Sequence, residues 1–496
     1  MRETRHLIAR YRAIFASVGT LLILGGGVTL APLLALIAYP SEAAHAAAFA
    51  LPGAVLVVVG ALLRTGLRAQ DRDPLTLQEG GVIVLLGWLV VIAFSAWPVA
   101  RLSGLPFPDA LFEAVSGWTT TGLSVVDVAH TDHLTLLWRS VMQLAGGAGL
   151  AIIMMSSIIG PVGASVASAE GRSDQLVPNV RRSARLVLVI YSAYAVVGTV
   201  AYRAAGLSPF DAINQAFAAV STGGFSTHPD SIGHWNSVAV EAVTIPLMLL
   251  GNLSFLTAWL LWRGRLRSVT RDAEVRLLGL FVAVASASLL LATTRALYPH
   301  IGKAVRVALF ESVSALTTTG YSTVSYAHWN GFGVLVIITL MVVGGGTCST
   351  AGGLKQYRVA LLWRLSVWRL RRMLLPRTVV LERPFLEGGK RVFVDDDAAN
   401  RVAAFAFLYI ATLVAGSLVL AATGSSVQDA LFEFASALGT VGLSVGVTSA
   451  HMPVAAMWAE MAGMFLGRLE FMVIIASIAK MVGDGRTVAR HLLSKR

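Results

Sequence analysis

The sequence predicts an all-α polytopic membrane protein, with two N-terminal spans followed by four repeats of span, short helix and span. Three observations predict this fold class. Of its 496 residues, 56% are hydrophobic and only 13% are charged, whereas soluble domains carry about 25% charged residues. The Lys and Arg residues gather in segments that alternate with segments holding very few. One polar, glycine-containing string occurs four times between apolar runs.

Ten apolar segments are long enough to span a bilayer, which requires about 20 apolar residues each. The predicted spans are 13–39, 46–63, 81–100, 134–160, 186–205, 237–262, 277–297, 331–365 with an interruption, 402–422 and 453–480. The N-terminal sequence MRETRHLIARYR is basic, and the apolar stretch after it is too long for a cleaved signal peptide. We therefore expect the first segment to be a spanning helix.

The basic residues predict the topology. Of the 39 Lys and Arg residues, 32 lie in segments 1–13, 64–80, 165–186, 263–276, 354–401 and 480–496. This is the positive-inside pattern, which places these segments and both termini in the cytoplasm. The net charge of +12 is therefore explained by topology, and we expect no nucleic-acid partner. The single cysteine, Cys348, excludes an intramolecular disulfide and a multi-cysteine metal site.

The repeated string defines an internal repeat of about 100 residues. The four copies are SGWTTTGLS (116–124), AVSTGGFST (219–227), SALTTTGYS (314–322) and SALGTVGLS (436–444). They align on Gly122, Gly224, Gly320 and Gly442, and nine residues before these stand Glu113, Gln215, Glu311 and Glu433. We expect a two-span preface at 1–75, repeats at 76–165, 166–265 and 266–375, a cytoplasmic linker at 376–400, and the fourth repeat with the C-terminal tail at 401–496.

The segment before each string is expected to be a short re-entrant helix. Residues 109–119 can form three helical turns, which are too short to cross a bilayer. Asp109, Asp211 and Asp429 lie in the first turns, where a carboxylate complements the positive helix end. Non-helical backbone at membrane depth persists only where it is buried in protein or lines water. Four such pore helices would bring the strings together around a pseudo-fourfold pore.

Four extended strings meeting at an axis would form rings of backbone carbonyls, which can replace the hydration shell of a monovalent cation. The strings contain no carboxylate, which favours a potassium-like ion over calcium. The candidate ion-binding residues are Thr119, Thr120, Thr121, Gly122, Ser221, Thr222, Gly223, Gly224, Thr317, Thr318, Thr319, Gly320, Gly439, Thr440, Val441 and Gly442. The alternative is ordinary interhelical packing, but four copies in register favour a filter.

A second candidate element is GGGTCSTAGG at 344–353. The apolar run 331–343 before it is too short to span, so the glycine-rich piece is expected to interrupt a helix at membrane depth. We expect a gate or hinge there; the alternative is close glycine-mediated helix packing. The candidate gate residues are Gly344, Gly345, Gly346, Thr347, Ser349, Gly352 and Gly353.

Charged residues in the last span are costly and usually face a cavity or a partner. Arg468, followed by Glu470, is expected to lie in the permeation path and to bind carbonyls of the interrupted loop. The alternative is a side chain that snorkels to the interface.

Glu113, Glu311 and Glu433 are expected to form structural hydrogen bonds to the filter backbone. No phosphate loop, HExxH motif or nucleophile elbow occurs in a usable context, so we expect no enzyme activity.

Together with the four strings, three motifs carry a family resemblance: GGFSTH (223–228), GGGTCSTAGGLK (344–355) and LGRLEF (466–471). The chain resembles the Trk/Ktr/HKT potassium transporter superfamily, and most closely its bacterial TrkH branch. The resemblance implies potassium uptake across the bacterial inner membrane, a homodimer with one pore per protomer, and a cytoplasmic TrkA-type nucleotide-binding regulatory subunit. It implies no covalent cofactor; potassium is the transported ion, and nucleotide acts only through the partner. The family's filter, gating loop and pore-facing arginine carry over to the strings, to 344–353 and to Arg468.

The strings are not uniform. Gly223 replaces a threonine in the second string, and Gly439 and Val441 replace two threonines in the fourth. In the plant branch of the superfamily, serine at the first filter glycine is associated with sodium transport, and here all four glycines are present. A sodium-permeable or sodium- or proton-coupled cation transporter is the alternative. A broken-helix solute symporter is a further one, although such proteins often show inverted repeats. A receptor or scaffold without transport would not explain four re-entrant loops.

Overall fold

The computed structural model describes residues 2–67, 75–149, 180–376, 384–387, 390–469 and 471–493. This part of the chain is helical except for one antiparallel hairpin, β1 (Pro384–Glu387) and β2 (Lys390–Phe393), in which Pro384 lies opposite Phe393. The predicted all-α fold class is confirmed.

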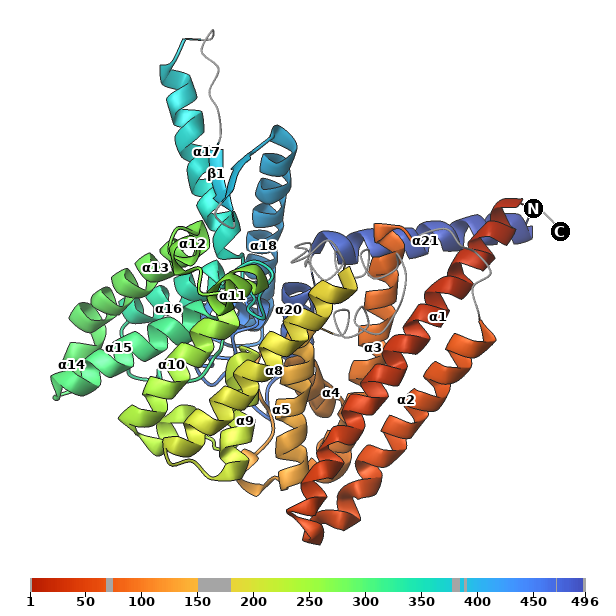
Figure 1. Cartoon of the computed structure of the whole chain (residues 1–496), viewed down its shortest axis with the longest axis horizontal. Coiled ribbons are helices and arrows are strands. Elements are labelled where there is room, and N and C mark those ends of the chain that lie inside the picture. The colour runs from red at the N-terminus through yellow and green to blue at the C-terminus, as the bar shows by residue number, and fades with distance from the viewer. Residues whose placement is uncertain are drawn as a thin grey trace. The chain divides into compact units, whose positions relative to one another are not determined.

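The chain divides into two compact units, and residues 1–119, 125–192 and 468–496 make up the first. Its elements are α1 (Arg2–Leu30), η1 (Ala31–Ile37), η2 (Pro40–His45), α2 (Ala46–Gly66), α3 (Leu77–Ser103), α4 (Phe107–Trp118), η3 (Val128–His130), α5 (His133–Ala148), the start of α8 (Val180–Ala204) and α21 (Phe471–Leu493). Helices α1 and α2 run side by side (Figure 1). A Cβ added to Gly19 would lie 2.6 Å from the Gly60 oxygen, so small residues permit this close approach.

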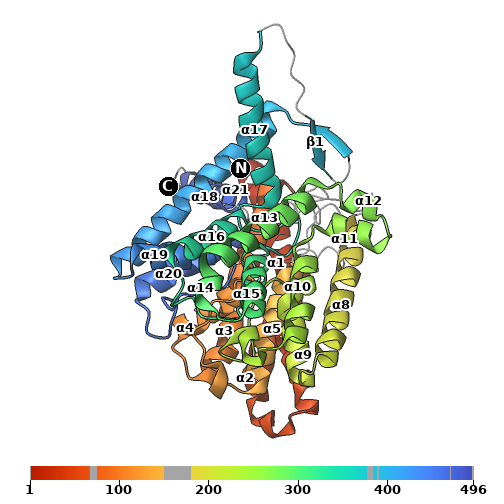
Figure 2. The ribbon, with the colours of Figure 1, turned by 90° about the vertical axis from the view of Figure 1, so that its left-hand side faces the viewer.

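The second unit comprises residues 120–124 and 193–467. Its helices are α9 (Pro209–Val220), η4 (Ser231–Trp235), α10 (Val238–Asn252), α11 (Phe255–Trp262), α12 (Leu266–Val269), α13 (Ala273–Leu289), η5 (Leu290–Thr294), α14 (Arg295–Leu297), α15 (Ile301–Leu316), α16 (Gly331–Val343), α17 (Gln356–Leu374), α18 (Asp396–Ala422), α19 (Val427–Leu438) and α20 (Val454–Arg468). Helices α13, α15 and α16 pack together (Figure 2). Helix α9 packs on α10, and α19 packs on both α16 and α18.

Six described helices are long and apolar enough to cross a membrane, or eight if each of two bent pairs counts as one span. The predicted span 331–365 consists of α16, a non-helical loop and α17, as the glycine-rich interruption indicated. The predicted span 134–160 begins as α5, and its remainder lies outside the described residues. The count of ten spans therefore stays a prediction.

Two spans predicted as continuous are broken. The segment 237–262 forms α10 and α11, which meet at an angle of 117°. Leu253 at the break is extended, and the Ser254 side chain restarts the helix by accepting a hydrogen bond from the Thr257 N–H at 3.2 Å. The segment 453–480 likewise forms two helices, α20 and α21. The sequence indicated an interruption only in 331–365 and did not indicate these two breaks.

The four short helices lie where the repeat predicts them. Helices α4, α9 and α19 each have 12 residues, and their first turns contain Asp109, Asp211 and Asp429. Ser208 and Ser426 cap α9 and α19 by accepting hydrogen bonds from the N–H groups of these aspartates. Each of the four helices, including the 16-residue α15, ends directly before the four residues that finish at the aligned glycine of its repeat. These segments are Thr119–Gly122, Ser221–Gly224, Thr317–Gly320 and Gly439–Gly442, and 'string' means this four-residue segment from here on.

The buried ion pair between Arg10 of α1 and Glu79 of α3 gives a test of this packing. We expect Arg10→Met to lower stability by about 3–5 kcal/mol, because the Glu79 carboxylate would stay buried without its guanidinium. The melting temperature of the purified protein in detergent measures this loss. The double variant Arg10→Met/Glu79→Gln should recover more than half of it; a double variant as unstable as the single one would contradict the explanation.

Candidate functional site

All four strings share one backbone conformation. The second residue of each string has a left-handed φ, at 56° in Thr120, 51° in Thr222, 54° in Thr318 and 49° in Thr440. The fourth residue is left-handed too, at 95° in Gly122, 74° in Gly224, 76° in Gly320 and 95° in Gly442. A positive φ is unfavourable for threonine because the side chain is β-branched, and such strain is typically held at functional sites.

The four glycines close a ring within the second unit. A Cβ added to each glycine would lie against the carbonyl oxygen of the third residue in the next string. This added Cβ would lie 2.2 Å from the Gly223 oxygen at Gly122 and 2.1 Å from the Thr319 oxygen at Gly224. It would lie 1.8 Å from the Val441 oxygen at Gly320 and 2.2 Å from the Thr121 oxygen at Gly442. The order 1–2–3–4–1 is a closed cycle, so the strings surround one axis. No side chain fits at these glycines.

Oxygen atoms dominate the ring. The side chains of the second threonines are fully buried, whereas the glycines at the fourth positions are half-buried. The hydroxyls of Thr120 and Thr440 have no hydrogen-bond partner in the described part of the chain. Each helix also ends at the residue before its string, where its terminal carbonyls carry partial negative charge. The four strings thus bring oxygen atoms together without contributing any ionised side chain.

Behind each string, the polar side chain nine residues before the glycine holds the segment that follows the string. Glu113 accepts the Val125 N–H at 3.1 Å, Glu311 accepts the Thr323 N–H at 2.8 Å, and Glu433 accepts the Val445 N–H at 3.0 Å. In the second repeat, Gln215 donates to the Ser226 hydroxyl at 2.8 Å. The sequence predicted bonds from the glutamates to the filter backbone itself; the bonds observed here instead hold the backbone that follows the filter glycines.

Residues 344–355 form a compact loop between α16 and α17. The Gly345 N–H donates to the Gly352 oxygen at 3.1 Å, and the Gln356 N–H donates to the Gly345 oxygen at 2.8 Å. Gly344 and Gly353 have positive φ angles of 68° and 80° and pack on each other, since a Cβ added to Gly344 would lie 2.6 Å from Gly353 Cα. The glycines therefore allow the chain to reverse in a space without room for side chains.

The loop contacts the strings directly. The Gly352 N–H donates to the Thr318 hydroxyl at 2.8 Å, and the Thr222 hydroxyl donates to the Thr350 hydroxyl at 3.0 Å. A Cβ on Gly352 would lie 2.3 Å from the Gly439 oxygen. The loop thus lies against the first half of the strings, at the end opposite to the half-buried glycines.

A buried and a half-buried polar side chain anchor the other face of the loop. Asn252, at the end of α10, accepts the Gly346 N–H at 3.1 Å. Glu274, in the first turn of α13, accepts the Thr347 N–H at 2.9 Å. The Cys348 oxygen accepts the Phe255 N–H at 3.2 Å. The break between α10 and α11 therefore makes room for this loop.

Arg468 is half-buried at the end of α20. Its Nη2 donates to the Gly146 oxygen at 2.5 Å and to the Gly147 oxygen at 3.3 Å, near the C-terminal end of α5. A cation at a helix C-terminus satisfies carbonyls that lack helical partners. Arg468 therefore binds backbone carbonyls, although the expected bond to residues 344–353 stays a prediction. Glu470 lies outside the described residues.

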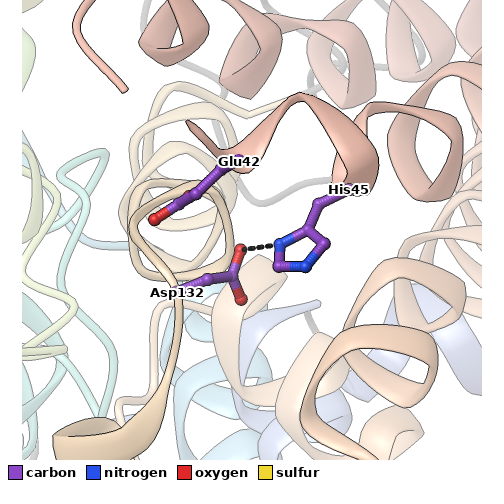
Figure 3. Close-up of side chains that lie close together, drawn as sticks. All are labelled: Glu42, His45 and Asp132. Atoms are coloured by element: carbon purple, nitrogen blue, oxygen red, sulfur yellow. Dashed lines mark ion pairs between the residues drawn. The ribbon is translucent and has the colours of Figure 1, made fainter. Parts of the chain in front are cut away.

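A separate polar cluster lies in the first unit, where Glu42, His45 and Asp132 bring three ligand-type atoms within 4.8 Å of one another (Figure 3). His45 Nδ1 is 3.5 Å from Asp132. Both carboxylates already cap α5, because Glu42 accepts the N–H groups of His133 and Leu134, and Asp132 accepts that of Thr135. The cluster ties the connection between α1 and α2 to the start of α5.

The comparisons with known proteins agree on one family. The family model of TrkH, described as a cation transport protein, matches residues 45–489. The chain belongs to the TrkH family of cation transport proteins. It is 31% identical to the Trk system potassium uptake protein TrkH of Halomonas elongata, covering 86% of this chain and 90% of that protein. It is 29% identical to the Escherichia coli K12 protein of the same name, covering 94% and 98%.

The crystal structure of the potassium transporter TrkH from Vibrio parahaemolyticus has the same fold, with a TM-score of 0.82, 27% identity, and coverage of 94% of this chain and 98% of that one. The resemblance inferred from the motifs is thus confirmed, and the chain is a membrane transporter rather than an enzyme. Sequence reasoning missed the left-handed threonines and the anchors Asn252 and Glu274. The carboxylate of Glu274 at the start of an apolar run could have indicated a buried polar contact there.

The hydrogen bond between the loop and the third string can be removed by a substitution that keeps the shape of the side chain. We expect Thr318→Val to lower the melting temperature, because the buried Gly352 N–H loses its acceptor at a cost of about 1–3 kcal/mol. Thr339→Val on α16 is the control, since its hydroxyl is exposed and bonds only within its own helix. Equal melting temperatures for Thr318→Val and the parent would show that the bond does not stabilise the loop.

Proposed function

We propose that this chain conducts potassium ions into a bacterial cell through the ring formed by its four strings. The observation that carries the proposal is the closed cycle of glycines against neighbouring carbonyls. Such oxygens replace the hydration shell of a monovalent cation. The relatives are named potassium uptake proteins, which supports potassium as the ion. The ion-binding residues are those of the four strings, Thr119–Gly122, Ser221–Gly224, Thr317–Gly320 and Gly439–Gly442.

The unequal side chains of the strings support backbone rather than hydroxyl coordination. Val441 offers no hydroxyl, yet its carbonyl oxygen takes the same place beside Gly320 as that of Thr319 beside Gly224. The four carbonyls of the third residues are therefore the common ligands. The hydroxyls of Thr120 and Thr440, which have no partner in the described residues, supply additional oxygens on two sides of the ring.

The loop 344–353 is proposed as the gate. The bonds from Gly352 to Thr318 and from Thr222 to Thr350 hold it against the strings, so an ion leaving the ring on that side requires the loop to move. Its anchors on Asn252 and Glu274 hold the resting arrangement. Arg468, which binds carbonyls at the end of α5, is proposed to add positive charge to the path beyond the ring.

The assembly and location follow from the family resemblance and the charge pattern. We propose that the protein lies in the bacterial inner membrane with both termini in the cytoplasm, because the basic segments follow the positive-inside pattern. We propose a homodimer with one pore in each protomer, regulated by a cytoplasmic TrkA-type subunit that binds the nucleotide. The naming of the relatives as parts of a Trk system supports a multi-subunit assembly.

The function is tested in cells that lack potassium uptake, by growth at low potassium and by rubidium entry, with and without a TrkA-type subunit. We expect rescue by the parent chain and about tenfold slower rubidium entry for Gly320→Ser, because the added Cβ would lie 1.8 Å from the Val441 oxygen.

Gly302→Ser is the matched control, since a Cβ at Gly302, near the start of the helix α15 that precedes the third string, meets nothing within 4 Å. Unchanged rubidium entry and ion preference in Gly320→Ser would refute the filter assignment. Sodium flux without rubidium flux in liposomes that contain the parent protein would refute potassium as the ion.

The gate is tested by releasing its anchors. We expect Asn252→Ala and Glu274→Ala each to raise rubidium flux in liposomes without the regulatory subunit, by about threefold or more, since the resting loop loses a hydrogen-bond acceptor. Thr339→Ala on α16 should leave the flux unchanged. If both anchor variants fold and conduct at the parent rate, the loop does not limit the flux.

A further inference from the structure

The fourth repeat contains two buried carboxyl groups where the first contains a carboxylate and a guanidinium. In the first repeat, Arg139 Nε donates to Glu113 at 2.6 Å, and both side chains are almost fully buried. In the fourth repeat, Glu433 and Glu460 are both fully buried. The two glutamates are bonded to one residue: the Thr448 N–H donates to Glu433 and the Thr448 hydroxyl donates to Glu460, each at 2.9 Å.

Arg139 and Glu460 occupy equivalent positions. A Cβ added to Gly146 or to Gly467 would lie 2.0 Å from the oxygen of the last residue of the short helix before it, Trp118 or Leu438. These two glycines are therefore equivalent points of their repeats. Arg139 and Glu460 each stand seven residues before them. The first repeat thus has the cation of Arg139 at this position, which neutralises Glu113, whereas the fourth repeat has the acid Glu460.

The hydrogen bonds distinguish the two carboxyl groups. Glu433 accepts three hydrogen bonds. The donors are the Ser444 hydroxyl at 2.6 Å, the Thr448 N–H at 2.9 Å and the Val445 N–H at 3.0 Å. Such bonds stabilise the ionised form. Glu460 accepts only the Thr448 hydroxyl, and its Oε1 has no hydrogen-bond partner in the described residues.

The charges around the two carboxyl groups affect their ionisation. Within the described part of the chain, neither carboxyl group forms an ion pair, and the charged group that faces Glu460 from α19 is Glu433. The loop between α19 and α20 contributes Thr448 and a single basic residue, His451, which is exposed. Burying a carboxylate without a partner is costly, and two carboxylates in one dry site do not both ionise.

We propose that the Glu433–Glu460 pair is a proton-binding site behind the fourth string, with one proton held on Glu460 and the negative charge on Glu433. Protons bind from the aqueous phase and leave to it as the pH rises, and no other reactant is required. Loss of the proton would leave a negative charge on each glutamate. Both charges would then lie against Thr448, in the segment 444–448 that follows the filter residues of the fourth string. This inference does not depend on which ion the ring conducts.

Difference infrared spectroscopy of the purified full-length protein tests the site directly. We expect the C=O stretch of a protonated, buried carboxyl group in the parent, its loss in Glu460→Gln, and its retention in Glu433→Gln. Asp397→Asn is the control, since Asp397 is exposed in the first turn of α18. A band that persists in Glu460→Gln, or is missing in the parent, would overturn the proposal.

The melting temperature gives a second readout. Because an amide mimics the protonated carboxyl group, Glu460→Gln should fold, and it should at least halve the fall in melting temperature as the pH rises from about 4, near the ordinary pKa of a glutamate in an unfolded chain, to about 10. The proton is present at low pH and its stabilisation is lost as the pH rises. If the melting temperature of Glu460→Gln changes with pH as that of the parent does across this range, the proposed proton on Glu460 is contradicted.

Discussion

The close approach of each string glycine to the carbonyl oxygen of the next string is the constraint on which the rest of the structure depends. At these four places a carbonyl oxygen of one string lies so close to the glycine of the neighbouring string that no side chain fits, and the four contacts close a cycle around one axis. Carbonyl dipoles that face one another repel, and they stay in place only if the strings are held from outside. The helix glutamates hold the ends of the strings, and the loop 344–353 holds their first halves. The spans in turn provide the buried surroundings that these hydrogen bonds need.

Much of the fold and of the site could be predicted because the repeat occurs four times. One copy of Thr-Gly is compatible with helix packing, but four copies in register, each nine residues after a Glu or Gln, fix the short helices, the strings and the role of the glutamates. The interruption at 344–353 was predictable because glycine is dense there. The break at Leu253 was not, since the local sequence Asn-Leu-Ser contains neither glycine nor proline. That break depends on the distant loop, whose Gly346 N–H bonds to Asn252.

The left-handed threonines show another limit of sequence reasoning. A β-branched residue with positive φ contradicts its own conformational preference, so no local rule indicates it. The explanation is positional: the turn at the second residue of a string precedes the third residue, whose carbonyl oxygen lies against the glycine of the neighbouring string. This conformation also directs the hydroxyls of Thr222 and Thr318 to the loop. The same residues therefore shape the ring and connect it to the proposed gate on two of its four sides.

A single chain with four unequal repeats can modify one string at a time. In a tetramer of identical subunits, an acid introduced behind the filter would appear four times, and four unpaired carboxylates would be difficult to bury. Here the helix glutamate is neutralised by Arg139 in the first repeat and is bonded by Tyr326 and Thr323 in the third, while in the fourth it shares Thr448 with a second acid, Glu460. A change of charge at Glu460 would therefore act on the segment after one string and leave the other three supported. The departure from fourfold symmetry is thus what allows a proton to influence the ring without dismantling it.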